Sequence, residues 1–246
     1  MTNNSPKIAM ILAAGLGKRM RPLTYKTPKP LLTVSGRTLL DYGLDHLAKA
    51  GIEKVIINIH HLANQILHHI ESRTDVDIII SDESDELLET GGGVAKALSH
   101  MDDAPFFVLN GDILWLDGPT AALSRLVRCW NEREMDGLLL LHSTVEAYGY
   151  SGVGDFLIDS VGMLSKRPEQ QVSPYVFTGV QLLHPRLFKN GFHSSFSLNY
   201  LYDRSIAGER LFGIIHDGDW FHIGTDDGLN QAEAYFQRRF PSTRHR

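Results

Sequence analysis

The sequence predicts an α/β fold built on a doubly wound, mostly parallel, Rossmann-like sheet with a small additional lobe. Short apolar runs alternate with helical patterns through residues 1–142, which is the order expected of βαβ units. The apolar runs are continuous, as at residues 55–57 and 106–109, and such strands suit a parallel sheet that is covered on both faces. The length of 246 residues favours one domain with a core of its own.

The first half of the chain supplies most of the expected sheet. Apolar runs predict strands at residues 8–13, 54–59, 76–81, 105–110 and 137–142, and the segments between them predict helices at 38–50, 62–71, 93–101 and 120–134. Gly51 follows the first of these helices, where a left-handed cap is expected. In sheets of this kind, ligands bind beyond the carboxyl ends of the strands.

The second half has a different rhythm. Glycines and turn residues gather at residues 148–155, and short strand-like pieces follow up to Ser165. Longer patterns predict strands at 176–183 and 211–215, and helices at 198–207 and 226–239. The sequence has no internal repeat and no low-complexity linker, so we expect this half to extend the same domain.

Composition and charge argue against several classes of protein. A net charge of −5 disfavours nucleic-acid binding, which normally goes with a basic surplus. The single cysteine, Cys129, excludes an internal disulfide and suits a reducing cytoplasm, and its helical run beside Trp130 predicts a buried thiol. The sequence has no apolar signal segment and no run long enough to span a membrane. We therefore expect a cytoplasmic protein without nucleic-acid or membrane partners, and no amphipathic surface predicts an oligomeric interface.

Residues 10–30, MILAAGLGKRMRPLTYKTPKP, contain the most specific motif. An apolar strand runs into a glycine-containing loop with the cations Lys18, Arg19 and Arg21, and Lys29 follows between two prolines. A strand that feeds a loop of small residues lets backbone N–H groups approach an anion, and fixed cations beside it hold a polyphosphate. Neither GxGxxG nor GxxxxGK[ST] occurs here, so the motif indicates a nucleoside triphosphate site of a less common kind.

This motif, GxGxRMxPLT followed by PKP, resembles the N-terminal signature of the sugar-1-phosphate nucleotidyltransferases, the pyrophosphorylases that make nucleotide sugars. The resemblance covers residues 7–236 and implies the nucleotide-diphospho-sugar transferase type of the predicted fold. It implies one domain over residues 1–246, with a nucleotide-binding half at 7–142 and a sugar-phosphate-binding half at 143–236. The short bacterial N-acetylmuramate-1-phosphate uridylyltransferases, enzymes of cell-wall peptidoglycan recycling, are most similar in pattern, and short mannose-1-phosphate guanylyltransferases come next.

The resemblance implies condensation of an NTP with a sugar 1-phosphate to give an NDP-sugar and pyrophosphate. We expect Arg19 to hold the β- and γ-phosphates and Lys29 to bridge the α-phosphate and the sugar phosphate. Asp112 closes the sequence Asn110-Gly111-Asp112 after an expected strand, where a carboxylate faces the ligand crevice, although NGD is also a common turn. In the family the matching aspartate binds the catalytic metal, so Asp112 is the expected ligand of Mg²⁺.

Residues 88–93, LETGGG, precede an expected helix. Successive glycines permit close approach to a planar ring, and the matching loop in the family lies against the nucleobase. The form of the segment resembles the muramate-type enzymes and favours UTP, although these residues alone do not choose the base. The resemblance thus implies a nucleotide-binding set of Leu12, Ala13, Ala14, Gly15, Gly17, Lys18, Arg19, Thr90, Gly91 and Gly92.

Two glycine-containing segments, at residues 152–156 and 177–180, resemble those that line the sugar-phosphate pocket, while a hairpin with incidental glycines is the alternative. Thr178 is expected to donate its hydroxyl to the sugar. Many relatives carry a Glu-Lys-Pro triplet shortly before the second segment, but residues 165–168 here are SKRP, without the glutamate. The implied sugar-phosphate-binding residues are Lys29, Asn110, Gly154, Asp155, Thr178 and Gly179.

Residues 220–225, WFHIGT, depart from the family pattern Trp-x-Asp-x-Gly-Thr, whose aspartate is the second metal ligand. His222 stands in its place, and imidazole is a poorer ligand for Mg²⁺ than for Mn²⁺ or other transition metals. His222 could bind a metal with changed preference, or contact phosphate or sugar while Asp112 and water hold the ion. A nearby carboxylate (Asp217, Asp219 or Asp226) could substitute for it, or the site could be degenerate.

The remaining histidines and acidic residues predict no further site, and two rival functions are open to test. His60, His61, His68 and His69 are expected on a solvated helix face, and the acidic run at residues 82–86 in a solvated loop. A non-catalytic nucleotide-sugar sensor on the same fold would bind nucleotide without releasing pyrophosphate. A dinucleotide-dependent oxidoreductase is disfavoured because Met20 replaces the third glycine of its fingerprint.

Overall fold

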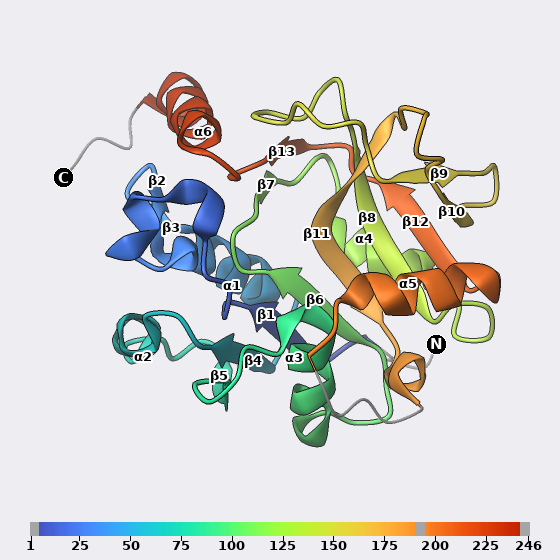
Figure 1. Ribbon diagram of the computed structural model, residues 1–246, viewed down its shortest axis with the longest axis horizontal. Helices are drawn as coiled ribbons and strands as arrows, with labels where there is room; N and C mark the ends of the chain where they lie inside the picture. The colour runs from blue at the N-terminus through green and yellow to red at the C-terminus, as the bar shows by residue number, and fades with distance from the viewer. Residues whose placement is uncertain (1–4, 190–194, 242–246) are drawn as a thin grey trace.

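The computed structural model describes residues 5–189 and 195–241 and has a nine-stranded central sheet (Figure 1). Seven strands follow in hydrogen-bonded order: β10 (Leu164–Lys166), β9 (Phe156–Ile158), β11 (Tyr175–Leu183), β6 (Phe106–Asn110), β1 (Ile8–Leu12), β4 (Lys54–Ile59) and β5 (Asp77–Asp82). Two more, β8 (Gly137–Ser143) and β12 (Leu211–Ile215), extend from β11. The predicted α/β class with a mostly parallel central sheet is confirmed.

The parallel strands β1, β4, β5 and β6 end at one edge of the sheet. Leu12, the last residue of β1, is level with Asn58 of β4 and Asn110 of β6. Both asparagines lie beside apolar strand residues, residues 55–57 and 59 in β4 and residues 106–109 in β6. The register therefore brings two polar side chains to either side of the loop that follows β1.

β11 connects this parallel part to the second half of the chain. It pairs antiparallel with β6 on one side and with β8 on the other. The ladder with β8 shifts register between Phe177 and Gln181, and Thr178 and Gly179 lie in this interruption. Both halves of the chain thus share one strand.

Helices cover the two faces of the sheet (Figure 1). Alternate residues of β1 enter different cores, with Ala9 and Ile11 in one and Ile8 and Met10 in the other, so the strand is apolar throughout. The first core includes residues of α1 (Leu39–Lys49), α2 (Ala63–Ile70) and α4 (Ala122–Cys129), and the second includes residues of α3 (Glu89–Ala97) and α5 (Leu198–Ala207).

A third core lies beyond the carboxyl edge and involves α6 (Asp226–Arg239). β13 (Asp219–Phe221) pairs antiparallel with β7 (Leu114–Leu116), and Phe221 lies opposite Leu114. This pairing brings the segment after Phe221, which contains His222, to the segment that follows Asp112. The remaining elements are the hairpin β2 (Thr33–Val34) and β3 (Arg37–Thr38) and the 3₁₀ turns Lys18–Met20, Leu23–Tyr25, Lys29–Leu31, Leu98–His100 and Pro185–Phe188.

Several elements match their predicted bounds, whereas α3 and α4 do not. β4, α5, β12 and α6 begin and end as predicted. α3 begins at Glu89, four residues early, so the three glycines are helical instead of forming a loop before the helix. α4 is shorter than predicted, and Cys129 at its end is exposed, so the prediction of a buried thiol was wrong. No helix within residues 5–189 and 195–241 is long and apolar enough to cross a membrane.

Candidate active site

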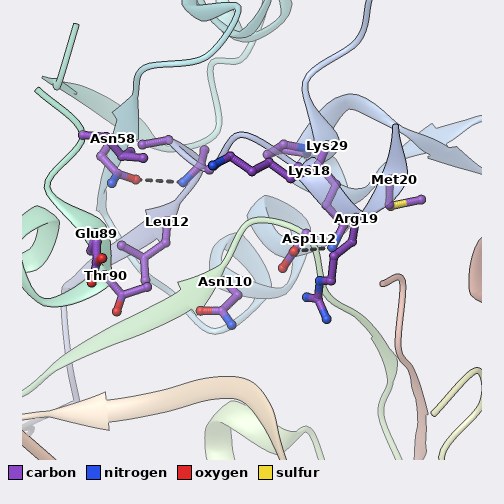
Figure 2. Close-up of a pocket in the computed structure, with 16 residues that line it drawn as sticks. Leu12, Lys18, Arg19, Met20, Lys29, Asn58, Glu89, Thr90, Asn110 and Asp112 are labelled. Atoms are coloured by element: carbon purple, nitrogen blue, oxygen red, sulfur yellow. Dashed lines mark hydrogen bonds and ion pairs between the residues drawn. The ribbon is translucent and has the colours of Figure 1, made fainter. Parts of the chain in front are cut away.

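A cavity of about 360 Å³ opens at the carboxyl edge of the parallel strands (Figure 2). Arg19, Lys29 and Asp112 lie toward one end of it, while Asn58, Glu89 and Thr90 lie toward the other. Its walls come from the loop after β1, the Lys29 turn, the end of β6 and the start of α3. The lining residues are Leu12, Ala13, Ala14, Gly15, Gly17, Lys18, Arg19, Met20, Lys29, Pro30, Asn58, Leu87, Glu89, Thr90, Asn110 and Asp112.

The loop after β1 is fixed around Gly17. Its φ of +59° is left-handed, and a Cβ there would lie 2.8 Å from the Thr24 side chain, so glycine is required. The Thr24 hydroxyl donates to the Gly17 carbonyl at 2.8 Å. Met20 is 1% exposed and anchors the following turn, whereas Lys18 and Arg19 are exposed. Neither cation forms an ion pair with another described residue, so both remain available to an anion in the cavity.

Lys29 and Asp112 form an ion pair in the same cavity. Lys29 Nζ lies 2.5 Å from Asp112 Oδ2, and the lysine is buried while the aspartate side chain is 34% exposed. Asp112 is held there by Gly111, whose N–H donates to the Leu12 carbonyl at 2.8 Å. A Cβ at Gly111 would lie 2.7 Å from that oxygen. Glycine therefore lets the chain turn tightly enough to bring the carboxylate beside β1.

Asn58 and Glu83 form a buried support behind the loop. The Ala13 N–H donates to Asn58 Oδ1 at 2.7 Å, and Asn58 Nδ2 donates to Glu83 Oε1 at 2.7 Å. Glu83 is 1% exposed, and its other oxygen accepts from the Leu88 N–H at 3.0 Å. The prediction of a solvated acidic loop was thus wrong for Glu83. Asn58 was missed, although a polar residue near the end of an apolar strand signals its role.

The glycines of α3 serve packing and do not line the cavity. The N–H groups of Gly91 and Gly92 donate to the Phe196 carbonyl at 2.8 and 3.1 Å. A Cβ at Gly91 would overlap the Phe196 ring. Thr90 lines the cavity, and its hydroxyl oxygen accepts from the Leu198 N–H at 2.9 Å. This corrects the interpretation that Gly91 and Gly92 lie open against a base.

A second cavity, of about 320 Å³, contains part of the predicted sugar set. It lies between β9–β10–β11 and α5, and Gly154 and Asp155 line it. Asp155 Oδ2 accepts from the Phe177 N–H at 2.8 Å. The remaining lining residues are Phe156, Lys166, Arg167, Phe177, Asn199, Tyr202 and Asp203.

Thr178 and Gly179 line neither of these cavities. Thr178 is 1% exposed, and its hydroxyl donates to the Leu140 carbonyl at 2.8 Å, so the prediction that it donates to a sugar was wrong. Gly179 has a φ of +86°, and a Cβ there would lie 2.8 Å from Asn110 Nδ2. Gly179 therefore lets β11 approach Asn110, which itself lines the first cavity.

His222 interacts electrostatically with charged groups that line both cavities. Burial lowers its pKa from the ordinary value, the charges of Lys29 and Arg19 lower it further, and Asp112 and Asp155 oppose them. Its ring stands edge-to-face against Tyr150, with centroids 5.6 Å apart. The ring is therefore neutral near pH 7, with a lone pair available to a cation or a proton donor.

The four histidines near α2 have separate partners. His60, His61 and His69 are partly buried and hydrogen-bond to the Glu83 carbonyl, the Thr24 carbonyl and Asp41, so only His68 fits the predicted solvated face. Within the described part of the chain, no three His, Cys, Asp or Glu residues cluster closely enough to hold a metal ion.

Comparisons with known proteins agree with the geometry. A family model described as nucleotidyl transferase matches residues 8–238. An N-acetylmuramate alpha-1-phosphate uridylyltransferase of Caulobacter vibrioides is 37% identical over 94% of this chain and 98% of its own. One of Neisseria meningitidis serogroup B is 36% identical over 92% and 96%. A solved UDP-glucose pyrophosphorylase complexed with UDP-glucose superposes with a TM-score of 0.77 over 95% of this chain and 99% of that one, at 15% identity, which supports the fold alone.

Proposed function

Because the chain belongs to the nucleotidyl transferase family, we propose that it transfers a uridylyl group from UTP to N-acetylmuramate 1-phosphate and releases pyrophosphate. The observation that carries this proposal is the 37% identity to an N-acetylmuramate alpha-1-phosphate uridylyltransferase over nearly the full length of both chains. The cation-lined cavity supports it, since a triphosphate needs fixed positive charge beside a loop of small residues.

We assign nucleotide binding to the first cavity. Lys18 and Arg19 meet the β- and γ-phosphates, and the loop from Leu12 to Gly17 offers its backbone N–H groups to the anion. Glu89 and Thr90 lie at the opposite end (Figure 2), where the base and ribose extend. The first half of the chain, residues 7–142, is then the nucleotide-binding half, and residues 143–236 form the sugar-phosphate-binding half, whose cavity holds the sugar ring.

The transfer requires no nucleophile from the protein. An oxygen of the sugar phosphate attacks the α-phosphorus of UTP, the bond to the β-phosphate oxygen breaks, and pyrophosphate leaves with the electron pair. Lys29 leaves Asp112 and meets the α-phosphate and the attacking phosphate, two anions that otherwise repel each other. Catalysis by this chain is then positioning and charge stabilisation.

The residues at the Lys29–Asp112 pair fit a divalent cation. The Asp112 carboxylate already holds a cation, the Lys29 ammonium, at 2.5 Å. One carboxylate completed by substrate phosphates is a usual environment for Mg²⁺, so Asp112 would hold the ion, with His222 as the candidate second ligand that broadens the choice to Mn²⁺. When bound, the ion would neutralise charge on the α-phosphate oxygens.

The test is pyrophosphate release by the purified protein in a grid of four NTPs against several sugar 1-phosphates, with Mg²⁺ and with Mn²⁺. We expect turnover with UTP and N-acetylmuramate 1-phosphate. Preference for GTP and mannose 1-phosphate would replace this proposal with a guanylyltransferase. Nucleotide binding without pyrophosphate release anywhere in the grid would indicate a sensor instead.

A further inference from the structure

We propose that Lys166 binds the carboxylate of an acidic sugar 1-phosphate, and that Asp203 is the counter-ion which this carboxylate displaces. The inference rests on the proposed function, because the lactyl group of N-acetylmuramate carries such a carboxylate. It assigns the choice of an acidic sugar over its neutral counterpart to one side chain of the second cavity.

The second cavity has room for a substituted sugar, and its α5 wall contacts a residue that lines the first cavity. At about 320 Å³ it falls at the lower end of the range for small-molecule sites. Its α5 wall begins at the first cavity, where the Leu198 N–H donates to the Thr90 hydroxyl oxygen at 2.9 Å. Asp155, on the other wall of the second cavity, and Asp112, in the first, both raise the pKa of His222 by their charge. A sugar whose 1-phosphate meets Lys29 therefore directs its ring substituents toward the second cavity.

Two adjacent cations line this cavity, but only one has a replaceable partner. Arg167 donates from Nε to the Gly154 carbonyl at 3.1 Å, and from Nη1 to the carbonyls of residues 168, 169 and 171 at 2.7–3.0 Å. These bonds fix the loop between β10 and β11. Lys166 Nζ instead lies 2.6 Å from Asp203 Oδ1, in a pair whose side chains are 62% and 44% exposed. Exposed pairs of this kind contribute little to stability, so Lys166 can exchange its partner at small cost.

The charges of the second cavity balance, since Lys166 and Arg167 are matched by Asp155 and Asp203, so Lys166 binds a carboxylate only in exchange for Asp203. Asp155 uses one oxygen on the Phe177 N–H, which leaves the other to accept from a sugar hydroxyl. An ammonium that binds a carboxylate makes a charge-assisted hydrogen bond, the stronger kind. A neutral sugar offers Lys166 nothing comparable, so Lys166 then stays with Asp203. The pair thus separates acidic from neutral sugars.

The experiment compares Lys166→Met and Asp203→Asn with wild type in pyrophosphate release from UTP, using N-acetylmuramate 1-phosphate and N-acetylglucosamine 1-phosphate, which lacks the lactyl group. For Lys166→Met we expect kcat/KM on the muramate substrate to fall about fivefold or more, mainly through KM. Activity on the glucosamine substrate should change less than about threefold and the KM for UTP should stay constant. Asp203→Asn should lower the KM for the muramate substrate by up to about fivefold. Lys7→Met, which breaks an exposed pair with Glu53 at 2.5 Å away from both cavities, is the matched control.

Two results would overturn the inference while leaving the proposed function intact. One is an unchanged preference for the muramate substrate in Lys166→Met, and the other is an equal loss on both substrates. A raised KM in Asp203→Asn would also contradict the role of counter-ion. Wild type without turnover on N-acetylmuramate 1-phosphate would instead refute the proposed function. In that case, calorimetry with UDP-N-acetylmuramate and UDP-N-acetylglucosamine would still test the inference. The inference requires that wild type binds UDP-N-acetylmuramate more tightly, and that Lys166→Met shows no such preference.

Discussion

Lys29 and Asp112 form an ion pair in the first cavity, with Lys29 Nζ 2.5 Å from Asp112 Oδ2. A buried ammonium without a partner is costly, so Asp112 supplies the opposite charge and orients Lys29 in the cavity. Under the proposed function, substrate binding would exchange these partners: phosphate oxygens would accept from the Lys29 ammonium, and Asp112 would hold a divalent cation. Arg19 differs, because it is exposed and forms no ion pair with a described residue.

We expect Arg19→Ala and Lys29→Ala each to lower kcat/KM by about 100-fold or more, equivalent to about 3 kcal/mol of transition-state stabilisation. The cause is the loss of positive charge where the reacting phosphates crowd together. Steady-state kinetics of pyrophosphate release measures the effect, and circular dichroism checks folding. Lys26→Ala removes an exposed cation that does not line the cavity and should behave as wild type. Near-normal turnover of either variant would show that the substituted residue does not have the proposed role in phosphate binding.

Asn58→Leu should lower the free energy of unfolding by about 3 kcal/mol, because it leaves the Ala13 N–H and a Glu83 oxygen buried without their partners. Denaturant titration measures this change. Asn199→Leu, at an exposed position of α5, should stay within about 0.5 kcal/mol of wild type. Equal stability of the two variants would show that Asn58 does not support the loop.

At this scale the sequence predicted best where side-chain chemistry is local to a motif. Arg19, Lys29, Asp112 and Asn110 all line one cavity, as the loop and strand-end patterns indicated. The predictions for Glu83 and Thr178 were wrong because the environments of these side chains depend on distant segments. Glu83 is buried against Asn58, and the Thr178 hydroxyl donates to the Leu140 carbonyl. Periodicity and composition do not report such partners.

At the scale of elements, α3 shows how packing determines where a helix begins. Glycine weakens helices, so three in a row predicted a later start than the observed Glu89. The glycines remain helical because α5 approaches closely, with the Phe196 carbonyl accepting from both Gly91 and Gly92. The helix is thus paired to a segment more than 100 residues away in sequence, which no local pattern reveals.

Gly91→Ala should destabilise the fold by about 1–3 kcal/mol, since the new Cβ would meet the Phe196 ring and lie 2.9 Å from its carbonyl oxygen. The gain in helix propensity, about 1 kcal/mol, does not offset this overlap, because the backbone at Phe196 would have to move. Gly15→Ala is the control, as nothing lies within 4 Å of its Cβ position. Thermal unfolding of both variants measures the difference, and an unchanged midpoint for Gly91→Ala would contradict the close packing.

At the scale of the whole molecule, buried histidines set the response to acid. Burial lowers the pKa of His216 and of His184, and the charge of Arg186 lowers that of His184 further. The unfolded chain takes up these protons near the ordinary pKa of about 6.5, before the folded chain does. The unfolded state therefore binds more protons between the lowered pKa values and 6.5, and stability rises with pH across that window.

We accordingly expect the free energy of unfolding to fall as the pH is lowered from 7.5 to 5.5, and His216→Gln to flatten this dependence. Denaturant titrations at the two pH values measure it. His68→Gln, at a side chain that is 87% exposed, should keep the slope of wild type. A wild-type slope in His216→Gln would exclude His216 as a source of the pH dependence.

The sharing of β11 between β6 and β8 has a consequence for how the chain could be divided. A fragment that ends near residue 142 would leave β6 with an open edge where β11 belongs, and the complementary fragment would hold β11 without β6. We expect neither fragment to fold alone, but the two to assemble when mixed. Co-expression of residues 1–142 and 143–246 with affinity capture measures this, and an independently folded fragment would contradict it. The gene would then tolerate a break in its reading frame between the halves only if both pieces were made in the same cell.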